Sequence, residues 1–569
     1  MTIDLEAALR VEPAPRILFE RVAKLGARPR FMVEQGSDWR AITWSAFGDT
    51  VRRAAAWLAP TLQTGDRAAI FGHNRVEWIA AALAVQTVGA AMVPIYPAST
   101  DEQAAYVAEH SGAKVLFLAG AEAAVRVLVQ WSRYAAVERF VTLDDLDLVA
   151  LAATIPGAPG ASEVERRSIA WSRVQAVGAE CGDEQTLARM LATLQLDDTA
   201  IMLYTSGTTG LPKGVPLSHR NLAVNQADWI RAIAPQLPAQ PIDLLWLPMS
   251  HIFGFGESCI GNALGFTSYL VEPNDVLAKM PAVRPNVFMS VPAYWQKLAA
   301  TAMLADGAEA QRAKLAEITG GQLRFCLSGG AGLAQEIKQF LFGCGVLVLE
   351  GYGLTECSPT LTLNRPDAFR FDTVGKPLPS VELRLADDGE ILARGPSIFA
   401  GYHRDPEATK SAFDDEGWFH TGDVGRWTDD GFLQVVDRKK EILVTAGGKN
   451  VPPANIERLF AADPLVKHAL VYGDGKRYLV AGLWLDAEVT GGRLGALDSA
   501  ARKTKVAEYV EALRERVNGE LARFEQIKRV HVFDEPLTVA GGLLTASLKI
   551  RRKRIYEVYR AELEGLYEP

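Results

Sequence analysis

The stretch Tyr204–Val215 reads YTSGTTGLPKGV and continues directly from the apolar run Ala200–Tyr204. Seven of its twelve residues are Thr, Ser or Gly, and Lys213 lies near its end. Between a buried strand and the helix-like segment Asn221–Ile233, such a loop exposes N–H groups and hydroxyls that suit phosphate oxygens. A flexible linker has a similar composition, but this stretch is short and ends in Pro-Lys-Gly, which favours a phosphate loop. It is not the G-x-x-x-x-G-K-[ST] loop, because Lys213 precedes its glycine.

Apolar runs and helical patterns alternate through about the first 430 residues. Several runs are followed by a glycine-containing turn and then by a helical pattern. This alternation predicts α/β units built on largely parallel sheets. The runs that we expect to be strands are Arg67–Phe71, Lys114–Leu118, Ala200–Tyr204, Asn286–Ser290 and Val346–Glu350.

The pattern changes after about Gly375. From Val381 to Val436 the expected elements are short, and turn dipeptides occur at Asp388-Gly389, Glu416-Gly417 and Asp430-Gly431. Short segments that are separated by such dipeptides are typical of hairpins. This part of the chain therefore predicts a compact β subdomain.

A charged step, Asp437–Glu441, separates this part from about 130 further residues. That tail has its own helical patterns, at Lys503–Phe524 and Ile555–Leu566. We predict an α/β protein with a large N-terminal domain, residues 1–437, of two α/β subdomains plus the β subdomain. Residues 438–569 are expected to form an independent small C-terminal domain of the α/β or α+β type.

Composition excludes several classes of protein. A chain of 569 residues needs more than one core, and 49% hydrophobic with 22% charged residues is typical of globular proteins. The net charge of −8 gives no footprint for nucleic acid, so no such partner is expected. The five cysteines are scattered without a C-x-x-C pair, which argues against disulfides or structural zinc and favours a reducing compartment.

One segment has to be considered as a membrane span. Ile79–Ala98 lacks charge over 20 residues. It also contains Gln86 and Thr87 and is interrupted by Pro94 and Pro97, which favours a buried helix followed by a buried strand. The N-terminus carries early acidic residues and does not resemble a signal peptide. We therefore expect a cytoplasmic protein.

Three further stretches carry groups that suit a nucleotide. Glu350–Glu356, EGYGLTE, offers the Tyr352 ring to a base and a carboxylate to Mg²⁺, although a turn with a core tyrosine has the same letters. Phe419–Asp423, FHTGD, ends on a carboxylate that suits ribose hydroxyls or an ordinary turn. Lys549–Arg554 holds five basic residues in six positions, which indicates a polyanion site or a solvated helix start.

Six segments together resemble the ordered signature set of the adenylate-forming superfamily, which comprises acyl-CoA synthetases, luciferases and peptide-synthetase adenylation domains. In chain order they are TSGTTGLPKG (205–214), LPMSHIFG (247–254), EGYGLTE (350–356), FHTGD (419–423), DRKKEILVTAGGKN (437–450) and LTASLKIRR (544–552). The resemblance covers essentially the whole chain. Val93–Thr100, Arg284–Tyr294 and Asp437–Glu457 resemble bacterial long-chain fatty acyl-CoA synthetases in particular.

The resemblance implies binding of ATP, Mg²⁺ and the co-substrate CoA. The residues that would surround the phosphates are Thr205, Ser206, Gly207, Thr208, Thr209, Gly210 and Lys213. The adenine slot would be lined by Gly330, Ala331, Gly351, Tyr352 and Gly353, with Thr355 close to the phosphates. Asp423 and Arg438 would hold the ribose, and Glu356 would hold the metal ion.

The resemblance also implies the catalytic residues, which would be Lys549, Thr205, Glu356 and His251. Lys549 would bridge the negative charge that develops between the acid carboxylate and the α-phosphate. Lys440 would be the hinge about which the C-terminal domain swings to build the CoA site. His251 would border the acyl and pantetheine channel. By themselves, Lys440 fits an exposed charge run and His251 fits a structural role.

These implications predict an AMP-forming acid–thiol ligase that activates a medium- or long-chain fatty acid and transfers it to CoA. Gly254–Gly265 supplies small residues that leave room for an acyl chain, or equally allow close helix packing. Two alternatives stay open: an acyl-AMP ligase that serves a carrier protein, and a CoA ligase for an aromatic or alicyclic acid. A regulatory protein without turnover is disfavoured, because Lys549, Lys213 and Glu356 are all present.

The expected partners are the fatty acid, ATP and CoA. Oligomeric state is left as monomer or homodimer. Because fatty acids partition into bilayers, peripheral contact with the inner membrane face is left open beside the cytoplasmic location.

Overall fold

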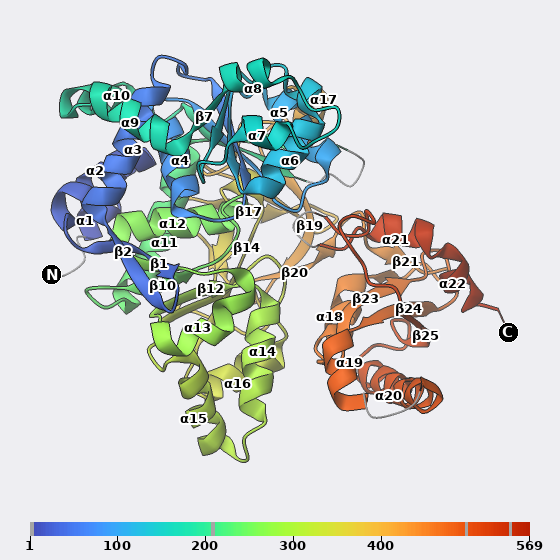
Figure 1. Ribbon diagram of the computed structural model, residues 1–569. Coiled ribbons are helices and arrows are strands. Elements are labelled where there is room, and N and C mark those ends of the chain that lie inside the picture. Colours follow the sequence, from blue (N-terminus) through green and yellow to red (C-terminus); the bar gives the residue numbers. More distant parts are fainter. Residues whose placement is uncertain (1–4, 206–210, 495–498, 546–548, 569) are drawn as a thin grey trace.

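The computed structural model describes residues 5–205, 211–494, 499–545 and 549–568. The C-terminal segment forms a separate lobe beside the larger N-terminal body (Figure 1). Two large sheets and one four-stranded sheet make up the body, and a three-stranded sheet with a two-stranded ribbon makes up the lobe. Among the described residues, no helix combines the length and the apolar character needed to cross a membrane. The predicted α/β class is confirmed.

The first large sheet has seven strands in the order β7-β6-β5-β3-β4-β8-β9. All neighbours are parallel except the last pair, β8 and β9. The strands are β3 (Arg67–Gly72), β4 (Ala91–Ile95), β5 (Val115–Ala119), β6 (Arg139–Thr142), β7 (Ser168–Ala170), β8 (Thr199–Thr205) and β9 (Lys213–Ser218). The helices of this part are α1 (Leu5–Ala8), α2 (Ala14–Leu25), α3 (Trp44–Leu58), α4 (Val76–Thr87), α5 (Asp101–Ser111), α6 (Ala121–Val129), α7 (Leu148–Ala152), α8 (Ala161–Arg167), α9 (Trp171–Cys181) and α10 (Glu184–Thr193).

The uncharged segment that raised the question of a membrane span is a core element. α4 buries eleven of its twelve residues, and all five residues of β4 are buried. Gln86, although polar, donates a hydrogen bond from Nε2 to the carbonyl oxygen of Ala200 at 3.1 Å. The predicted buried helix followed by a buried strand is therefore confirmed.

The second large sheet has nine strands in the order β16-β15-β14-β13-β12-β10-β11-β1-β2. Its central strands, from β14 to β1, are parallel. The strands are β1 (Pro29–Gln35), β2 (Asp38–Thr43), β10 (Ile242–Leu245), β11 (Thr267–Leu270), β12 (Val287–Ser290), β13 (Phe325–Ser328), β14 (Val348–Gly353), β15 (Thr360–Leu363) and β16 (Lys376–Pro377). The helices are α11 (His219–Ile233), α12 (Ile252–Leu264), α13 (Val276–Val283), α14 (Pro292–Met303), α15 (Ala308–Thr319) and α16 (Gln335–Gly343).

The predicted β subdomain is an antiparallel sheet in the order β17-β18-β19-β20. Asp388-Gly389 and Asp430-Gly431 lie in the turns that join its consecutive strands, as expected. The elements are β17 (Glu382–Leu385), β18 (Glu390–Arg394), α17 (Pro406–Ala412), β19 (Phe419–Trp427) and β20 (Leu433–Arg438). β20 runs through the predicted boundary at residue 437 and leads into the lobe.

The C-terminal lobe has its own hydrophobic core. Its elements are β21 (Leu443–Val444), β22 (Asn450–Val451), α18 (Pro453–Ala461), β23 (Val466–Tyr472), β24 (Leu479–Leu485), α19 (Ala487–Leu494), α20 (Ser499–Gly519), β25 (Ile527–Phe533), α21 (Arg552–Val558) and α22 (Arg560–Gly565). The expected single helix over 555–566 was wrong. Tyr559 interrupts it, because its ring is buried against Trp484 and Phe533, with ring centres 5.8 and 4.4 Å away.

Candidate active site

The hydroxyl-rich loop joins two antiparallel strands, since Thr205 at the end of β8 pairs with Lys213 at the start of β9. Ser206, Gly207, Thr208, Thr209 and Gly210 lie outside the described residues. The expected strand–loop–helix order was wrong, because β9 stands between the loop and α11. The apolar side chains that this strand buries are those of Val215 and Leu217. The loop therefore leads into a strand and not directly into the N-terminus of α11.

Lys213 is connected to the Glu356 motif through Tyr402. The ammonium of Lys213 lies 4.8 Å from the centre of the Tyr402 ring and 4.0 Å from Oδ2 of Asp405. The Tyr402 hydroxyl donates a hydrogen bond to Oε1 of Glu356 at 3.0 Å. Glu356 lies in a short 3₁₀ turn, Thr355–Cys357, directly after β14. A cation thus lies over the face of this ring, and a carboxylate accepts from its hydroxyl.

The glycine-rich segments lie where two parallel strands end. Gly330 and Ala331 follow β13, while Gly351, Tyr352 and Gly353 end the neighbouring strand β14. Ligands of α/β sheets bind at the carboxyl ends of parallel strands. A Cβ atom at Gly353 would lie 1.8 Å from the carbonyl oxygen of Pro359, so no larger residue fits there.

The loop after β13 is tied to β14 by a buried carboxylate. The N–H group of Leu333 donates to Oε1 of Glu350 at 2.6 Å, and Lys338 forms an ion pair with Oε2 of the same carboxylate. Both charged side chains are nearly inaccessible to solvent. The predicted adenine-slot residues are therefore brought to one edge of the sheet and held there by Glu350.

Asp423 joins three parts of the site. It receives a hydrogen bond from the Tyr352 hydroxyl at 2.6 Å on Oδ2, and Nε of Arg438 lies 2.9 Å from Oδ1. Asp423 and Arg438 are cross-strand neighbours on β19 and β20. Burial raises the pKa of Asp423 above its usual value, although Arg438, Tyr352 and Lys549 oppose the rise. The carboxylate of Asp423, the guanidinium of Arg438 and the ring of Tyr352 thus lie together on one side of the candidate site.

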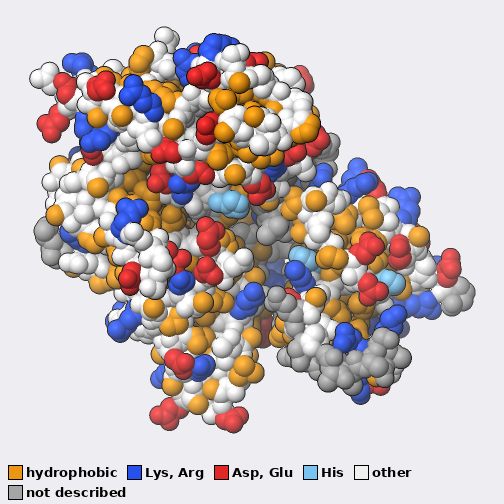
Figure 2. Space-filling view, in the orientation of Figure 1, with side chains coloured by type: hydrophobic (Ala, Val, Ile, Leu, Met, Phe, Trp, Pro, Cys, Tyr) orange, Lys and Arg blue, Asp and Glu red, His pale blue; other side chains and the backbone are white. Residues whose placement is uncertain are grey.

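Lys549 belongs to the C-terminal lobe, yet it acts on residues of the N-terminal body. Its positive charge adds to the effect of burial, which lowers the pKa of His251 to about 4. The side chain of Lys549 is still reached by solvent. The surrounding protein and the positive charge of Arg438 lower the pKa of Lys549, whereas the charge of Asp423 opposes this shift. Lys549 therefore lies at the junction of body and lobe, where Figure 2 shows a groove. Its main chain is held by Thr545, whose Oγ1 accepts from the Lys549 N–H group at 3.0 Å.

His251 is the N-cap of α12. Its Nδ1 accepts a hydrogen bond from the N–H group of Phe253 at 3.1 Å, which assigns the proton of the neutral ring to Nε2. The Tyr96 ring lies 6.4 Å away, centre to centre. His251 thus connects the groove to a helix that enters the interior of the body.

Lys440 is exposed in the segment between β20 and β21, two residues after Arg438. Close by, Arg552 at the start of α21 makes a double ion pair with Glu457 of α18, at 2.5 and 2.7 Å. Arg552 also lies 3.3 Å from Glu441. The basic run after Lys549 therefore anchors this part of the lobe to the segment that contains Lys440.

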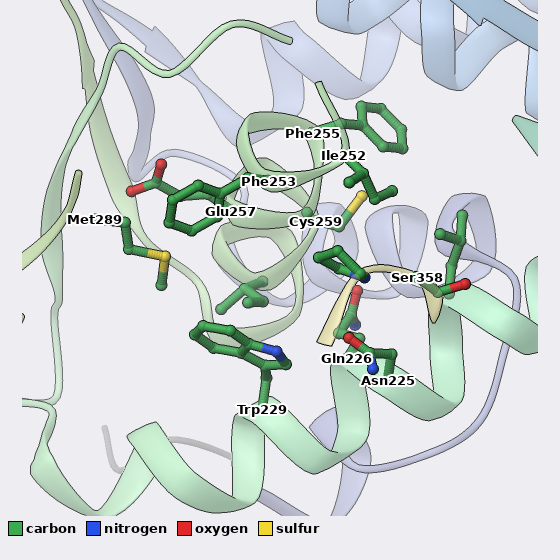
Figure 3. Close-up of a pocket in the computed structure, with 14 residues that line it drawn as sticks. Asn225, Gln226, Trp229, Ile252, Phe253, Phe255, Glu257, Cys259, Met289 and Ser358 are labelled. Carbon is green, nitrogen blue, oxygen red and sulfur yellow. The ribbon is translucent and has the colours of Figure 1, made fainter. Parts of the chain in front are cut away.

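A cavity with an empty volume of about 470 Å³, including the part that opens to solvent, lies between α11 and α12 (Figure 3). Its walls include Trp229 of α11, Phe253 of α12 and Met289 of β12. Within Gly254–Gly265, one glycine is closely packed and another borders the cavity. Gly254 packs closely, since an added Cβ would lie 2.4 Å from the carbonyl oxygen of Pro248, whereas Gly256 borders the cavity and has nothing within 4 Å.

Some residues of this site were not predicted. Tyr402 links Lys213 to Glu356, and Asp405 approaches Lys213. Both lie in an irregular stretch, Gly401–Asp405, whose only signal was an aromatic and charged composition after a glycine. The acidic residue of the cavity, Glu257, was also missed.

Two family models match this chain. Residues 18–403 match the model of the AMP-binding enzyme family, and residues 440–569 match that of the AMP-binding enzyme C-terminal domain. The chain is 33% identical over 584 residues to the long-chain-fatty-acid–CoA ligase FadD15 of Mycobacterium bovis, covering 93% of this chain and 92% of that protein.

Two solved structures share the fold. The adenylation domain of a carboxylate reductase from Mycobacterium chelonae has a TM-score of 0.82 at 22% identity, covering 100% of this chain and 94% of that one. The anthranilate CoA ligase AuaEII, in complex with anthranoyl-AMP, has a TM-score of 0.75 at 19% identity, with 97% and 98% coverage. The family matches span both the body and the lobe. The chain therefore belongs to the AMP-binding enzyme family, as its six motifs predicted, and is an AMP-forming ligase.

Proposed function

We propose that this enzyme joins a medium- or long-chain fatty acid to AMP, with release of pyrophosphate, and then transfers the acyl group to CoA. The observation that carries the proposal is the position of Lys549. It lies where its charge reaches Asp423, Arg438 and His251. The residues that follow His251 on α12 line the cavity. One helix thus runs from the groove to an apolar site that suits an acyl chain.

ATP would enter as its Mg²⁺ complex. The residues around the phosphates would be Thr205, Ser206, Gly207, Thr208, Thr209, Gly210 and Lys213, with Thr355 beside them. The adenine would lie against Gly330, Ala331, Gly351, Tyr352 and Gly353, and the ribose against Asp423 and Arg438. Glu356 fits the metal ion as a single carboxylate ligand, because Tyr402 occupies Oε1 and leaves Oε2, and Mg²⁺ is usually held by one or two carboxylates plus phosphates.

In the first half-reaction, a carboxylate oxygen of the acid attacks the α-phosphorus and the bond to pyrophosphate breaks. Such a step depends on positioning and on stabilising charge. The ammonium of Lys549 would contact the attacking carboxylate and the α-phosphate as their negative charges approach each other. His251 stays neutral at pH 7, because its pKa is about 4, and so adds no second positive charge beside the acid.

In the second half-reaction, the CoA sulfur attacks the acyl carbon and AMP leaves. We propose that residues 438–569 act as a mobile domain that turns at Lys440, withdraws Lys549 and completes the CoA site, with residues 1–437 as the adenylation core. Hinges are a few residues at element ends that absorb the change in backbone angles, and Lys440 lies between β20 and β21. His251 would then border the pantetheine path.

Two alternatives within this chemistry are kept. The acyl group could pass to a carrier protein, or the acid could be aromatic or alicyclic. The apolar cavity walls and the 33% identity to a long-chain-fatty-acid–CoA ligase support the fatty acid and CoA. A cytoplasmic location, peripheral contact with the inner membrane face, and a monomer or homodimer remain predictions.

The test is one incubation of the full-length enzyme with Mg²⁺, ATP, CoA and mixed acids, analysed by mass spectrometry. The acids run from butyrate to oleate and include benzoate and cyclohexanecarboxylate. Acyl-CoA products that peak at a medium- or long-chain acid are expected. Acyl-adenylate without thioester would favour the carrier alternative, and benzoyl-CoA or cyclohexanecarbonyl-CoA as the main product would contradict the fatty acid.

A further inference from the structure

One side chain of the cavity does not match an unsubstituted hydrocarbon. Among the described residues that line the cavity, Glu257 is the only acidic one. It is 1% exposed, and neither of its carboxyl oxygens has a hydrogen-bond partner within the described part of the chain. Figure 3 shows it beside Phe253 and Met289, on the side of the cavity away from Asn225. A buried polar group without a hydrogen-bond partner costs free energy on folding. Glu257 therefore either serves a purpose in the native protein or contributes nothing to its stability.

The surroundings of Glu257 determine its protonation state. Burial raises the pKa of Glu257 well above its usual value, and the charge of Asp243 raises it further. Asp243 is itself buried, with a pKa raised to about 6, and the positive charge of Arg30 opposes that rise. Both effects favour the protonated, neutral carboxyl of Glu257, while Asp243 and Arg30 are the oppositely charged pair beside it.

Arg30 is engaged elsewhere. Its guanidinium donates to Oδ1 of Asn262 at 2.9 Å, to Oγ of Ser268 at 2.6 Å and to the carbonyl oxygen of Ser258 at 3.1 Å. It forms no hydrogen bond with Glu257 in the described structure. The neutral carboxyl of Glu257 thus keeps both its O–H donor and its C=O acceptor for whatever occupies the cavity.

The position of Glu257 on α12 places this polar group along the acyl chain. Glu257 lies six residues after His251, about 9 Å further along the helix at 1.5 Å per residue. The acid carboxylate reacts at the His251 end, beside Lys549. A substituent that meets Glu257 would therefore lie in the interior of a long chain and not next to its carboxyl group.

We propose that Glu257 makes the enzyme selective for fatty acids that carry a hydroxyl or keto oxygen in mid-chain. This inference rests on the function proposed above. A chain hydroxyl can accept from the O–H of Glu257 and donate to its C=O, and a keto oxygen can accept. A methylene group in the same place would displace water from Glu257 without replacing its hydrogen bonds. A site built to bond a hydroxyl rejects analogues that lack it far more strongly than an apolar site rejects a change of size.

The experiment compares stearate with 2-, 10- and 12-hydroxystearate on the full-length enzyme. Acid-dependent pyrophosphate release and acyl-CoA formation give kcat/KM for each acid. We expect a mid-chain isomer to exceed stearate by about tenfold or more, and 2-hydroxystearate to show no such gain. In Glu257→Leu the preference should disappear, whereas Glu257→Gln, the matched control, keeps a donor and an acceptor and should retain most of it.

The outcomes separate the two proposals. Acyl-CoA from stearate at a rate equal to or above that of every hydroxy acid overturns the selectivity and leaves the proposed function intact. An unchanged preference in Glu257→Leu also overturns it. If none of these acids yields an adenylate or a thioester, the result contradicts both the proposed function and this inference. If Glu257→Leu does not fold, as judged by its thermal unfolding, loss of the preference in Glu257→Gln contradicts the proposal.

Discussion

Tyr352 donates its hydroxyl hydrogen to Asp423 across 2.6 Å, which joins the end of β14 in the nine-stranded sheet to β19 of the β subdomain. The bond brings together a ring from one motif and a carboxylate from another that is 71 residues away in the chain. It also leaves Oδ1 of Asp423 to Arg438, so that each oxygen has its own partner. The orientation of the proposed ribose-binding carboxylate thus depends on the proposed adenine-binding ring.

Replacing Tyr352 by Phe should therefore weaken ATP binding more than it weakens the fold. The ring remains, but Asp423 loses a hydrogen bond that is worth about 1.5–3 kcal/mol for a charged partner. We expect the KM for ATP to rise by roughly tenfold, as measured by pyrophosphate release at varied ATP. The matched control is Tyr509→Phe, which removes a hydroxyl bonded to Asp463 in the lobe. An equal rise in the control would contradict a specific role for Tyr352.

Removal of the Lys549 ammonium should act on the first half-reaction. Lys549→Ala is expected to lower the rate of adenylate formation by about 10²–10³, the usual effect of losing one preorganised charge donor. Transfer from chemically prepared acyl-AMP to CoA should be retained, because the proposed rotation of the lobe would withdraw Lys549 in that step. Lys553→Ala, an exposed neighbour, is the control. Equal losses in both half-reactions would indicate a structural role for Lys549 instead.

A rigid residue at the proposed hinge should separate the half-reactions in the opposite way. Proline fixes φ near −65° and removes the N–H group. We expect Lys440→Pro to form acyl-AMP at a near-normal rate while thioester formation falls by at least about tenfold, which corresponds to about 1.4 kcal/mol in the barrier. Lys440→Ala keeps a free backbone and should perform both steps. Normal thioester formation by Lys440→Pro would place the hinge elsewhere.

Stability should fall in mild acid because of His219. This residue begins α11, is 1% exposed, and has no hydrogen-bond partner for either ring nitrogen within the described residues. Burial lowers its pKa from 6.5 to about 4, so between these values the unfolded chain binds a proton that the folded chain does not. The folded state is thus disfavoured progressively as pH drops from 6.5 to 4, by up to roughly 3 kcal/mol.

The measurement is the unfolding midpoint at pH 7 and at pH 5, for the wild type and for His219→Asn. The variant side chain does not titrate, so its midpoint should depend less on pH in this window. His73→Asn changes an exposed histidine and should follow the wild type. The same pH dependence in all three proteins would show that other groups cause it.

The sequence was most informative where a residue type was dictated by the backbone or by a ligand. Gly353, which admits no Cβ, and the cross-strand pair of Asp423 and Arg438 lie at positions that the motifs marked. The five strands named from the sequence agree with the structure to within three residues at either end, because each is a short buried run.

Other features depend on contacts that no local pattern contains. β9 buries only two apolar side chains, Val215 and Leu217, beside Gly214, which is too short a pattern to reveal a strand. Tyr559 breaks a helical pattern because of aromatic rings from β24 and β25. Glu257 in a helix resembles a solvent-facing acid until the structure shows it buried beside Phe253 and Met289. The roles of Tyr402 and Glu257 thus follow from tertiary packing alone.

Arg438 stands at the end of β20, where the chain leaves the body, and its partner Asp423 stays within the body. The binding of a nucleotide to this pair would therefore depend on the orientation of the C-terminal lobe, which follows Arg438 in the chain. Linkage makes the effect reciprocal: the factor by which a nucleotide favours one orientation of the lobe equals the factor by which that orientation strengthens nucleotide binding. ATP and AMP differ in the phosphates they present to Lys213 and Lys549. The conversion of one into the other would then itself drive the lobe from its first working position to its second.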